Sequence, residues 1–213
     1  MVTIDARDTH AYPVMILLAF VLGLAMQYCL TRSRGMRREI AALTALAAFL
    51  CSAGCGLLLT FLTSGGKQLS FSSLGGLAGM YLGSLLVAGI ARRPYYITMA
   101  MQCCTLVLPL MYSVSKIGCL LAGCCRGMDW QGRWAVNYLT KEGECTALPV
   151  QGLESVSFLL LFILGMLWYR KRKPFAVHGI FLLSALTKFL LDFLRASHTG
   201  QILSVTQLLC HIR

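Results

Sequence analysis

Long apolar stretches alternate with short runs of basic residues along almost the whole chain. About six stretches are long enough to cross a membrane as helices, at residues 12–30, 40–62, 76–91, 97–121, 152–169 and 179–195. Only 13% of the residues are charged, whereas a soluble domain carries about a quarter. The chain therefore cannot cover itself with a polar surface. We expect an all-α polytopic membrane bundle, forming a single transmembrane domain over residues 1–213.

The positions of the basic residues predict the orientation of these helices. Runs of Lys and Arg follow the first, third and fifth stretches, at residues 32–38, 92–93 and 170–173. Cytoplasmic loops carry such an excess of positive charge. The long polar stretch 124–149, which contains acidic residues, follows the fourth span, so we expect both termini on the extracytoplasmic side. The net charge of +11 is divided among these loops and forms no single face, which argues against nucleic-acid binding.

Ionisable residues within or beside membrane spans cost free energy and are candidates for function. Six of them approach the predicted outer face: Lys116, Arg126, Glu154, Lys188, Asp192 and Arg195. The last three are spaced i, i+4 and i+7, so they share one face of a helix. The excess of cations suits the phosphate of an anionic lipid headgroup. Alternatively, these side chains could neutralise one another or extend to the interface; for the group as a whole we favour a site.

Three of the ten cysteines lie in the short segment 115–127, after most of the fourth span. We interpret Cys119, Cys124 and Cys125 first as small packing residues. The second interpretation is a disulfide between Cys124 or Cys125 and Cys145, and the third is a nucleophilic thiol. A metal site would need further ligands, and His is scarce nearby, so we expect no metal ion and no cofactor.

Six parts of the chain match, in order, the motifs of one enzyme family: Tyr12, 74–77 (LGGL), 116–127 (KIGCLLAGCCRG), 149–154 (PVQGLE), 188–195 (KFLLDFLR) and 200–207. The chain thereby resembles the prolipoprotein diacylglyceryl transferase family. That family has H-G-G-L at the second of these positions, the variant R-x-G-C-F-x-x-G-C-C-x-G at the third, and R-F-x-x-E-F-x-R at the fifth. The similarity spans almost the whole chain.

The resemblance implies a transfer of diacylglyceryl from phosphatidylglycerol, or another anionic phospholipid, to the thiol of a protein or peptide, with glycerol phosphate leaving. It implies four catalytic residues, Lys116, Glu154, Lys188 and Asp192, with Arg195 helping the two lysines to hold the phosphate. It also implies a set of further substrate-binding residues: Tyr12, Gly75, Gly76, Gly118, Cys119, Arg126, Gly127 and Gln151. The expected location is the bacterial plasma membrane, with the active face extracytoplasmic.

The chain departs from the family pattern at several polar positions. The departures are Lys for Arg at 116 and 188, Leu74 for a His, Cys119 for an Asn, Ser184 for a Tyr and Asp192 for a Glu. Two other functions therefore stay open: a related transferase with another acceptor, such as a small thiol or a dedicated peptide, and a non-catalytic membrane module that binds lipid. A transporter is a weaker alternative, because the sequence shows no internal repeat and no pair of broken helices.

Overall fold

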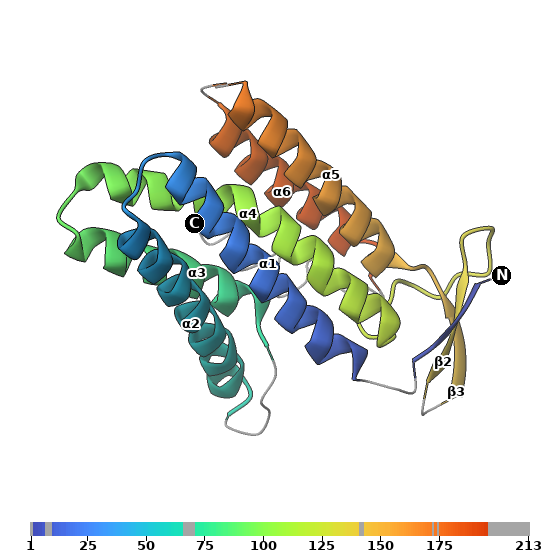
Figure 1. Ribbon diagram of the computed structural model, residues 1–213. Helices are drawn as coiled ribbons and strands as arrows, with labels where there is room; N and C mark the ends of the chain where they lie inside the picture. The colour runs from blue at the N-terminus through green and yellow to red at the C-terminus, as the bar shows by residue number, and fades with distance from the viewer. Residues whose placement is uncertain are drawn as a thin grey trace. The chain divides into compact units, whose positions relative to one another are not determined.

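The computed structural model describes residues 2–6, 10–65, 71–140, 143–171, 173 and 175–195. In these residues the chain forms six helices and three strands (Figure 1): β1 (Val2–Asp5), α1 (Ala11–Ser33), α2 (Arg38–Thr63), α3 (Ser73–Ile90), α4 (Pro94–Leu121), β2 (Val136–Thr140), β3 (Gly143–Ala147), α5 (Val150–Arg170) and α6 (Ala176–Asp192). The matched segment 200–207 lies outside the described residues.

The helices follow the predicted spans closely. Among the described residues, α1 to α5 are long and apolar enough to cross a membrane. Helix α6 has 17 residues, at the short end of the usual range of about 17–25. Large apolar side chains point outward from the helices, as shown by Leu160 at 60% and Leu182 at 70% exposed, which suits a lipid environment. The predicted helical membrane fold is confirmed, whereas the orientation of the termini stays a prediction.

The described residues form two compact units. The terminal unit contains the chain up to Ala19 and from Pro109 onward, and the central unit is Phe20–Leu108. In the central unit, α3 packs against α2 through glycines spaced four residues apart. A Cβ added to Gly79 would lie 2.1 Å from the Cys51 carbonyl oxygen, and one added to Gly83 would lie 2.2 Å from the Ala47 carbonyl oxygen. Because glycine has no side chain, the two helix backbones can approach this closely.

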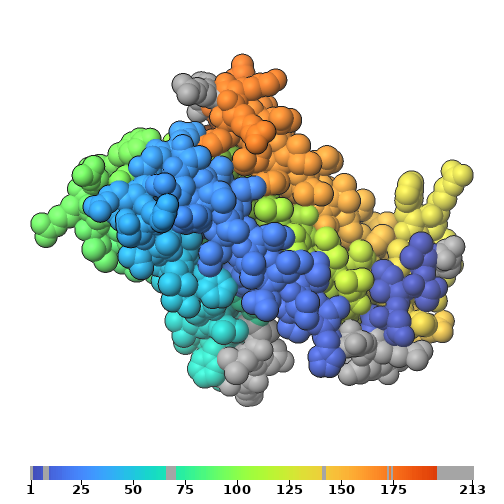
Figure 2. Space-filling model, in the orientation of Figure 1, coloured from blue at the N-terminus to red at the C-terminus, as the bar shows by residue number. Residues whose placement is uncertain are grey.

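A small three-stranded sheet lies in the terminal unit, beyond the C-terminal end of α4 and the N-terminal end of α5 (Figure 1). Strand β1 pairs in parallel with β2, with Val2 opposite Val136, and β2 pairs antiparallel with β3, with Tyr138 opposite Cys145. In Figure 2 the dark blue N-terminal strand lies against the yellow residues of the other two. The sequence predicted a polar loop here. The local sequence pattern did not reveal the sheet, because β1 comes from the N-terminus and is more than 130 residues away from β2 in the sequence.

Three helices of the terminal unit carry the site residues. Helices α4 and α5 are joined by a hydrogen bond of 2.8 Å from the Ser113 hydroxyl to the Ser155 carbonyl. Helices α5 and α6 run side by side (Figure 1). Just after α6, the Met128 amide donates to the Leu194 carbonyl at 3.0 Å, which fixes the end of α6 beside the segment that follows α4. The ends of all three helices therefore meet.

Candidate active site

A fully buried carboxylate, that of Glu154 on α5, lies at the centre of the site. Lys116 Nζ on α4 lies 2.9 Å from its Oε2, and Lys188 Nζ on α6 lies 2.8 Å from its Oε1. Arg195 Nη2 donates to both oxygens, at 3.0 and 3.1 Å. The hydroxyl of Tyr112 donates to Oε1 at 3.1 Å. Together with Asp192, these residues form what we call the Glu154 cluster, which brings together all four predicted catalytic residues and Arg195.

Asp192 supplies the second negative charge of the cluster. Its Oδ1 lies 3.7 Å from Lys188 Nζ and 3.4 Å from Arg195 Nε. Three cations and two carboxylates leave one net positive charge among side chains that are mostly buried. Arg195 Nε is buried and has no hydrogen-bond acceptor among the described residues. Since uncompensated buried charge is costly, this arrangement favours the binding of an anion.

Tyr112 is a member of the cluster that the sequence analysis missed. Besides donating to Glu154, its ring lies 5.0 Å from Lys116 Nζ and 5.6 Å from Lys188 Nζ, within the range of cation–π attraction. The ring also packs on Phe158, with centroids 4.3 Å apart. The signal that could have found it is the i, i+4 spacing from Lys116, which places both residues on one face of α4.

The last turn of α4 carries Cys119, and the tight turn that follows the helix carries Cys124 and Cys125. Gly123 and Cys125 both adopt positive φ angles, +62° and +55°. The sulfur atoms of Cys119, Cys124 and Cys125 all lie within 4.8 Å of one another. Hydrogen bonds from the Cys119 and Cys124 thiols hold the pKa of Cys125 well below its ordinary value. We call this segment, residues 119–125, the cysteine turn.

The disulfide to Cys145, which was the second interpretation, is not formed, since every described cysteine is free. The Cys145 thiol lies on β3, where it donates to the Tyr138 carbonyl at 3.8 Å and is contacted by the guanidinium of Arg126. Arg126 therefore extends toward the sheet, where it contacts Cys145 on β3. Its predicted role in substrate binding stays a prediction.

Gln151 ties the cysteine turn to the sheet. It is fully buried, its Nε2 donates to the Cys124 carbonyl at 2.6 Å, and its Oε1 accepts from the Tyr138 hydroxyl at 3.4 Å. Burial raises the pKa of Tyr138 to about 12, so this hydroxyl stays a donor. These contacts indicate that Gln151 positions the turn, whereas its predicted contact with substrate is untested.

Two predicted glycines hold the backbone beside the site. A Cβ added to Gly127 would lie 2.6 Å from the Leu148 carbonyl oxygen, and Gly127 forms a β-bridge with Arg195. A Cβ added to Gly118 would lie 2.8 Å from the Met15 Cβ on α1. Because of these contacts neither position has room for a side chain without a shift of its neighbours. Tyr12, near the start of α1, lies near the three thiols of the cysteine turn.

Gly75 and Gly76 lie in the central unit, on α3. A Cβ added to Gly75 would lie 2.4 Å from the Cys55 carbonyl oxygen on α2, and one added to Gly76 would lie 2.6 Å from the Phe71 ring. Both glycines thus serve close packing within that unit. Their predicted part in substrate binding stays a prediction.

A comparison with protein families identifies the family of the chain. The whole chain, residues 1–213, matches the family model described as prolipoprotein diacylglyceryl transferase. No curated protein matches the chain. With five helices suited to a membrane and a match along its full length, the chain belongs to the prolipoprotein diacylglyceryl transferase family, whose members are membrane enzymes that transfer the diacylglyceryl group of phosphatidylglycerol to the cysteine of a prolipoprotein.

Proposed function

We propose that the Glu154 cluster binds the phosphate of phosphatidylglycerol during this transfer. The observation that carries the proposal is one fully buried carboxylate that binds three cations, Lys116, Lys188 and Arg195. With Asp192 included, the cluster has a net charge of +1, and the phosphodiester of the lipid carries one negative charge. Binding therefore neutralises the cluster and offsets the cost of keeping its charge away from water.

The same cations stabilise the leaving group. As the bond between the glyceryl carbon and the phosphate oxygen breaks, the electron pair stays on that oxygen. The charge of the phosphate thereby rises from one negative charge to two. Lys116 and Lys188 act on it as point charges, while the guanidinium of Arg195 offers a planar set of donors, including an Nε that makes no hydrogen bond to the described residues. Because the cations are already held in place by Glu154, they need not reorganise when the charge develops.

The two carboxylates set the positions of the cations. Without Glu154, three positive side chains would repel one another within one small volume. Asp192, the last residue of α6, forms ion pairs with Lys188 and Arg195. Both distances are longer than those from the same cations to Glu154. We assign Glu154 and Asp192 to positioning the cations that bind the phosphate.

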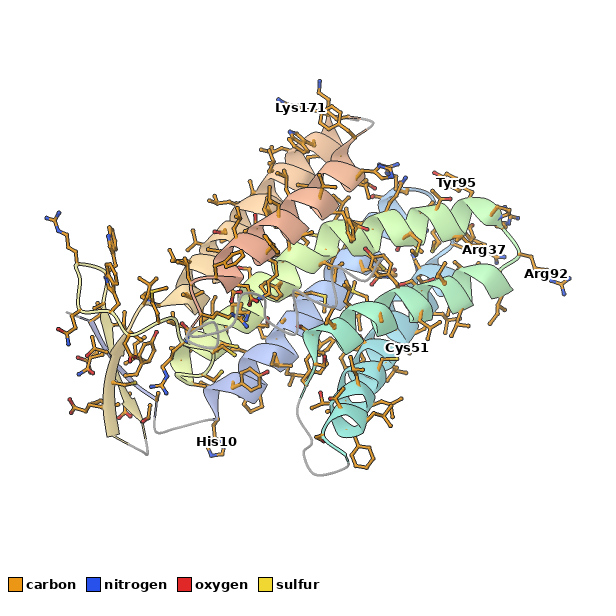
Figure 3. The ribbon with its side chains drawn as sticks, turned by 180° about the vertical axis from the view of Figure 1, so that it is seen from behind. His10, Arg37, Cys51, Arg92, Tyr95 and Lys171 are labelled. Carbon is orange, nitrogen blue, oxygen red and sulfur yellow. The ribbon has the colours of Figure 1, made fainter. Side chains whose placement is uncertain are left out.

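We further propose that the active face is extracytoplasmic, in a bacterial plasma membrane. In the terminal unit, Lys171 lies at the tip that joins α5 to α6, at the far end of α5 from the sheet (Figure 3). The 17 helical steps between Glu154 and Lys171 correspond to about 25 Å, close to the thickness of the hydrocarbon core. Since basic residues mark the cytoplasmic side, the Glu154 cluster belongs to the opposite side.

Purified protein in phosphatidylglycerol vesicles, given a lipobox peptide, tests the proposal. We expect a thioether-linked diacylglyceryl peptide and free glycerol phosphate by mass spectrometry. Lys116→Ala, Lys188→Ala and Arg195→Ala should each lower the rate at least 100-fold and weaken binding of phosphatidylglycerol. Arg92→Ala, at an exposed turn of the central unit where the side chain points away from the helices (Figure 3), is the matched control. Unchanged rates in all three cluster variants would contradict the assignment.

The acceptor can be tested separately. If phosphatidylglycerol binds and the cluster variants abolish that binding, but no lipobox peptide is modified, the lipid site stands and the acceptor differs. Small thiols, or a peptide with Cys in another sequence context, would then be supplied in the same vesicles. A peptide with Ser in place of its Cys serves as the control, because a hydroxyl cannot give the thioether product.

A further inference from the structure

The three sulfur atoms of the cysteine turn form a cluster that the proposed lipid site does not use. All three lie within 4.8 Å of one another. In a tetrahedral thiolate site, zinc–sulfur bonds of about 2.3 Å place the sulfurs about 3.8 Å apart. The observed separations therefore need only small side-chain rotations to meet around one ion. The sequence argued against a metal because His is scarce, but the turn supplies three ligands without any His.

The backbone holds these sulfurs together at an energetic cost. Cys125 has φ +55°, a left-handed conformation that non-glycine residues rarely adopt. Gly123, with φ +62°, permits the reversal just before it. The Cys124 amide donates to the Cys119 carbonyl at 3.1 Å, and Gln151 Nε2 donates to the Cys124 carbonyl at 2.6 Å. Backbone strain such as that at Cys125, held here by the fully buried side chain of Gln151, is typical of functional sites.

We propose that Cys119, Cys124 and Cys125 bind one zinc ion as thiolates and leave its fourth position open to the acceptor thiol. Three protein ligands with one open position are the arrangement of catalytic zinc sites. Cys119 is buried, whereas Cys124 and Cys125 are exposed, so an incoming ligand can reach the ion. The role of the fourth position rests on the proposed transferase function, but the zinc site itself does not.

The surrounding charges suit this ion. Three thiolates and one divalent cation sum to one negative charge. The positive charge of Lys116 acts on all three sulfurs, and that of Arg195 acts on Cys125. Both cations also bind Glu154, so the cysteine turn borders the proposed phosphate site. An acceptor sulfur held at the turn would be a neighbour of the lipid headgroup.

The group-transfer step balances without an oxidant or reductant. The acceptor thiol displaces water from the zinc ion and releases its proton to water. A lone pair of the zinc-bound sulfur forms the bond to the glyceryl carbon, while the bond from that carbon to the phosphate oxygen breaks. The electron pair of the broken bond stays on the phosphate, and glycerol phosphate leaves. The neutral thioether is a weaker ligand than a thiolate and leaves the ion.

Metal content is the first test. The full chain is purified under reducing conditions with a tag free of His and Cys, incubated with zinc and dialysed. We expect one zinc per chain in the wild type and less than a tenth of that in the Cys119→Ser, Cys124→Ser, Cys125→Ser variant. The variant with Cys29, Cys51 and Cys55 changed to Ser is the matched control and should keep the zinc. No zinc in the reduced wild type, or equal zinc in the first variant, would overturn the proposal.

Cobalt exchange tests the ligands and the open position without any turnover. We expect sulfur-to-cobalt charge-transfer absorption in the wild type and none in the variant of the cysteine turn. A lipobox peptide should then change the cobalt spectrum, whereas the same peptide with Ser in place of Cys should not. A spectrum that does not respond to the Cys peptide would overturn the open position. Lipidation at the wild-type rate in the variant of the turn would also overturn that role, while leaving the proposed lipid site intact.

Discussion

Glu154 shows how a single residue can organise a site inside a membrane protein. Its two oxygens accept from three cations and a tyrosine hydroxyl, and the carboxylate is inaccessible to solvent. Removing each cation from water costs free energy, and three unpaired cations in one place would also repel one another. Because the carboxylate pairs with all three, the cations stay close together at the proposed phosphate site.

We expect Glu154→Gln to abolish transfer and to destabilise the fold by about 3–5 kcal/mol, because one buried and two partly buried cations lose their main counter-charge. Thermal unfolding in detergent and the rate of peptide lipidation measure the two effects. Glu39→Gln removes an exposed carboxylate that lies 3.9 Å from Arg37, and it should change neither quantity. Equal melting temperatures for the two variants would show that Glu154 does not carry the charge balance assigned to it.

Tyr112→Phe separates the two contacts of the tyrosine. The change removes the hydrogen bond to Glu154 but keeps the ring beside Lys116 and Lys188, so we expect a loss of about 1 kcal/mol in stability. Tyr112→Leu also removes the ring and should cost more in both stability and rate. Unfolding midpoints and initial rates of the two variants give the comparison. Identical behaviour of the two would mean that cation–π contacts contribute nothing here.

Cys125 allows a test by pH. A pKa held below the ordinary value means that the thiolate persists as the pH falls. Metal is first removed with a chelator, and the rate of Cys125 alkylation is then measured by peptide mass spectrometry. This rate should change little between pH 6 and pH 8. For a thiol with the ordinary pKa of about 8.5, the alkylation rate would rise about 75-fold over that range. The Cys119→Ala, Cys124→Ala variant lacks both hydrogen-bond donors to Cys125, so its alkylation rate should show the steeper dependence on pH.

At the scale of elements, the contact between α2 and α3 depends on glycine. The backbones approach so closely that a methyl group at Gly79 would overlap the Cys51 carbonyl oxygen. We expect Gly79→Ala to cost about 1–3 kcal/mol through overpacking. Gly89→Ala, in the same helix but with nothing within 4 Å of the added Cβ, should be neutral or slightly stabilising. Thermal unfolding of both variants measures the difference, and a Gly79→Ala variant as stable as Gly89→Ala would contradict the close approach.

At the scale of the whole molecule, orientation is the property that decides which substrates can reach the site. Trp134, which is 77% exposed beside the sheet, should face the extracytoplasmic side, and Lys171 the cytoplasm. In intact cells, a membrane-impermeant maleimide should label Trp134→Cys above the wild-type background, whereas Lys171→Cys should be labelled only after lysis. The reverse pattern would place the Glu154 cluster in the cytoplasm and remove the basis for an extracytoplasmic acceptor.

The amino-acid sequence by itself determined the membrane fold and the charged residues worth examining. In the lipid bilayer no water is present to bond the backbone, so a long apolar stretch has to form its backbone hydrogen bonds within itself. Such a stretch is therefore helical whatever helices it packs against. The i, i+4, i+7 spacing of Lys188, Asp192 and Arg195 is likewise a local property of one helix.

Only the tertiary structure decided which charges meet. Lys116, Glu154 and Lys188 come from three helices, so no local pattern could show that one carboxylate binds both lysines. The sheet also depends on a distant partner, since β1 pairs with a strand that begins at Val136. The three thiols converge because a left-handed turn at the end of α4 reverses the chain. Each of these features depends on contacts between segments, and such contacts form only when the helices pack.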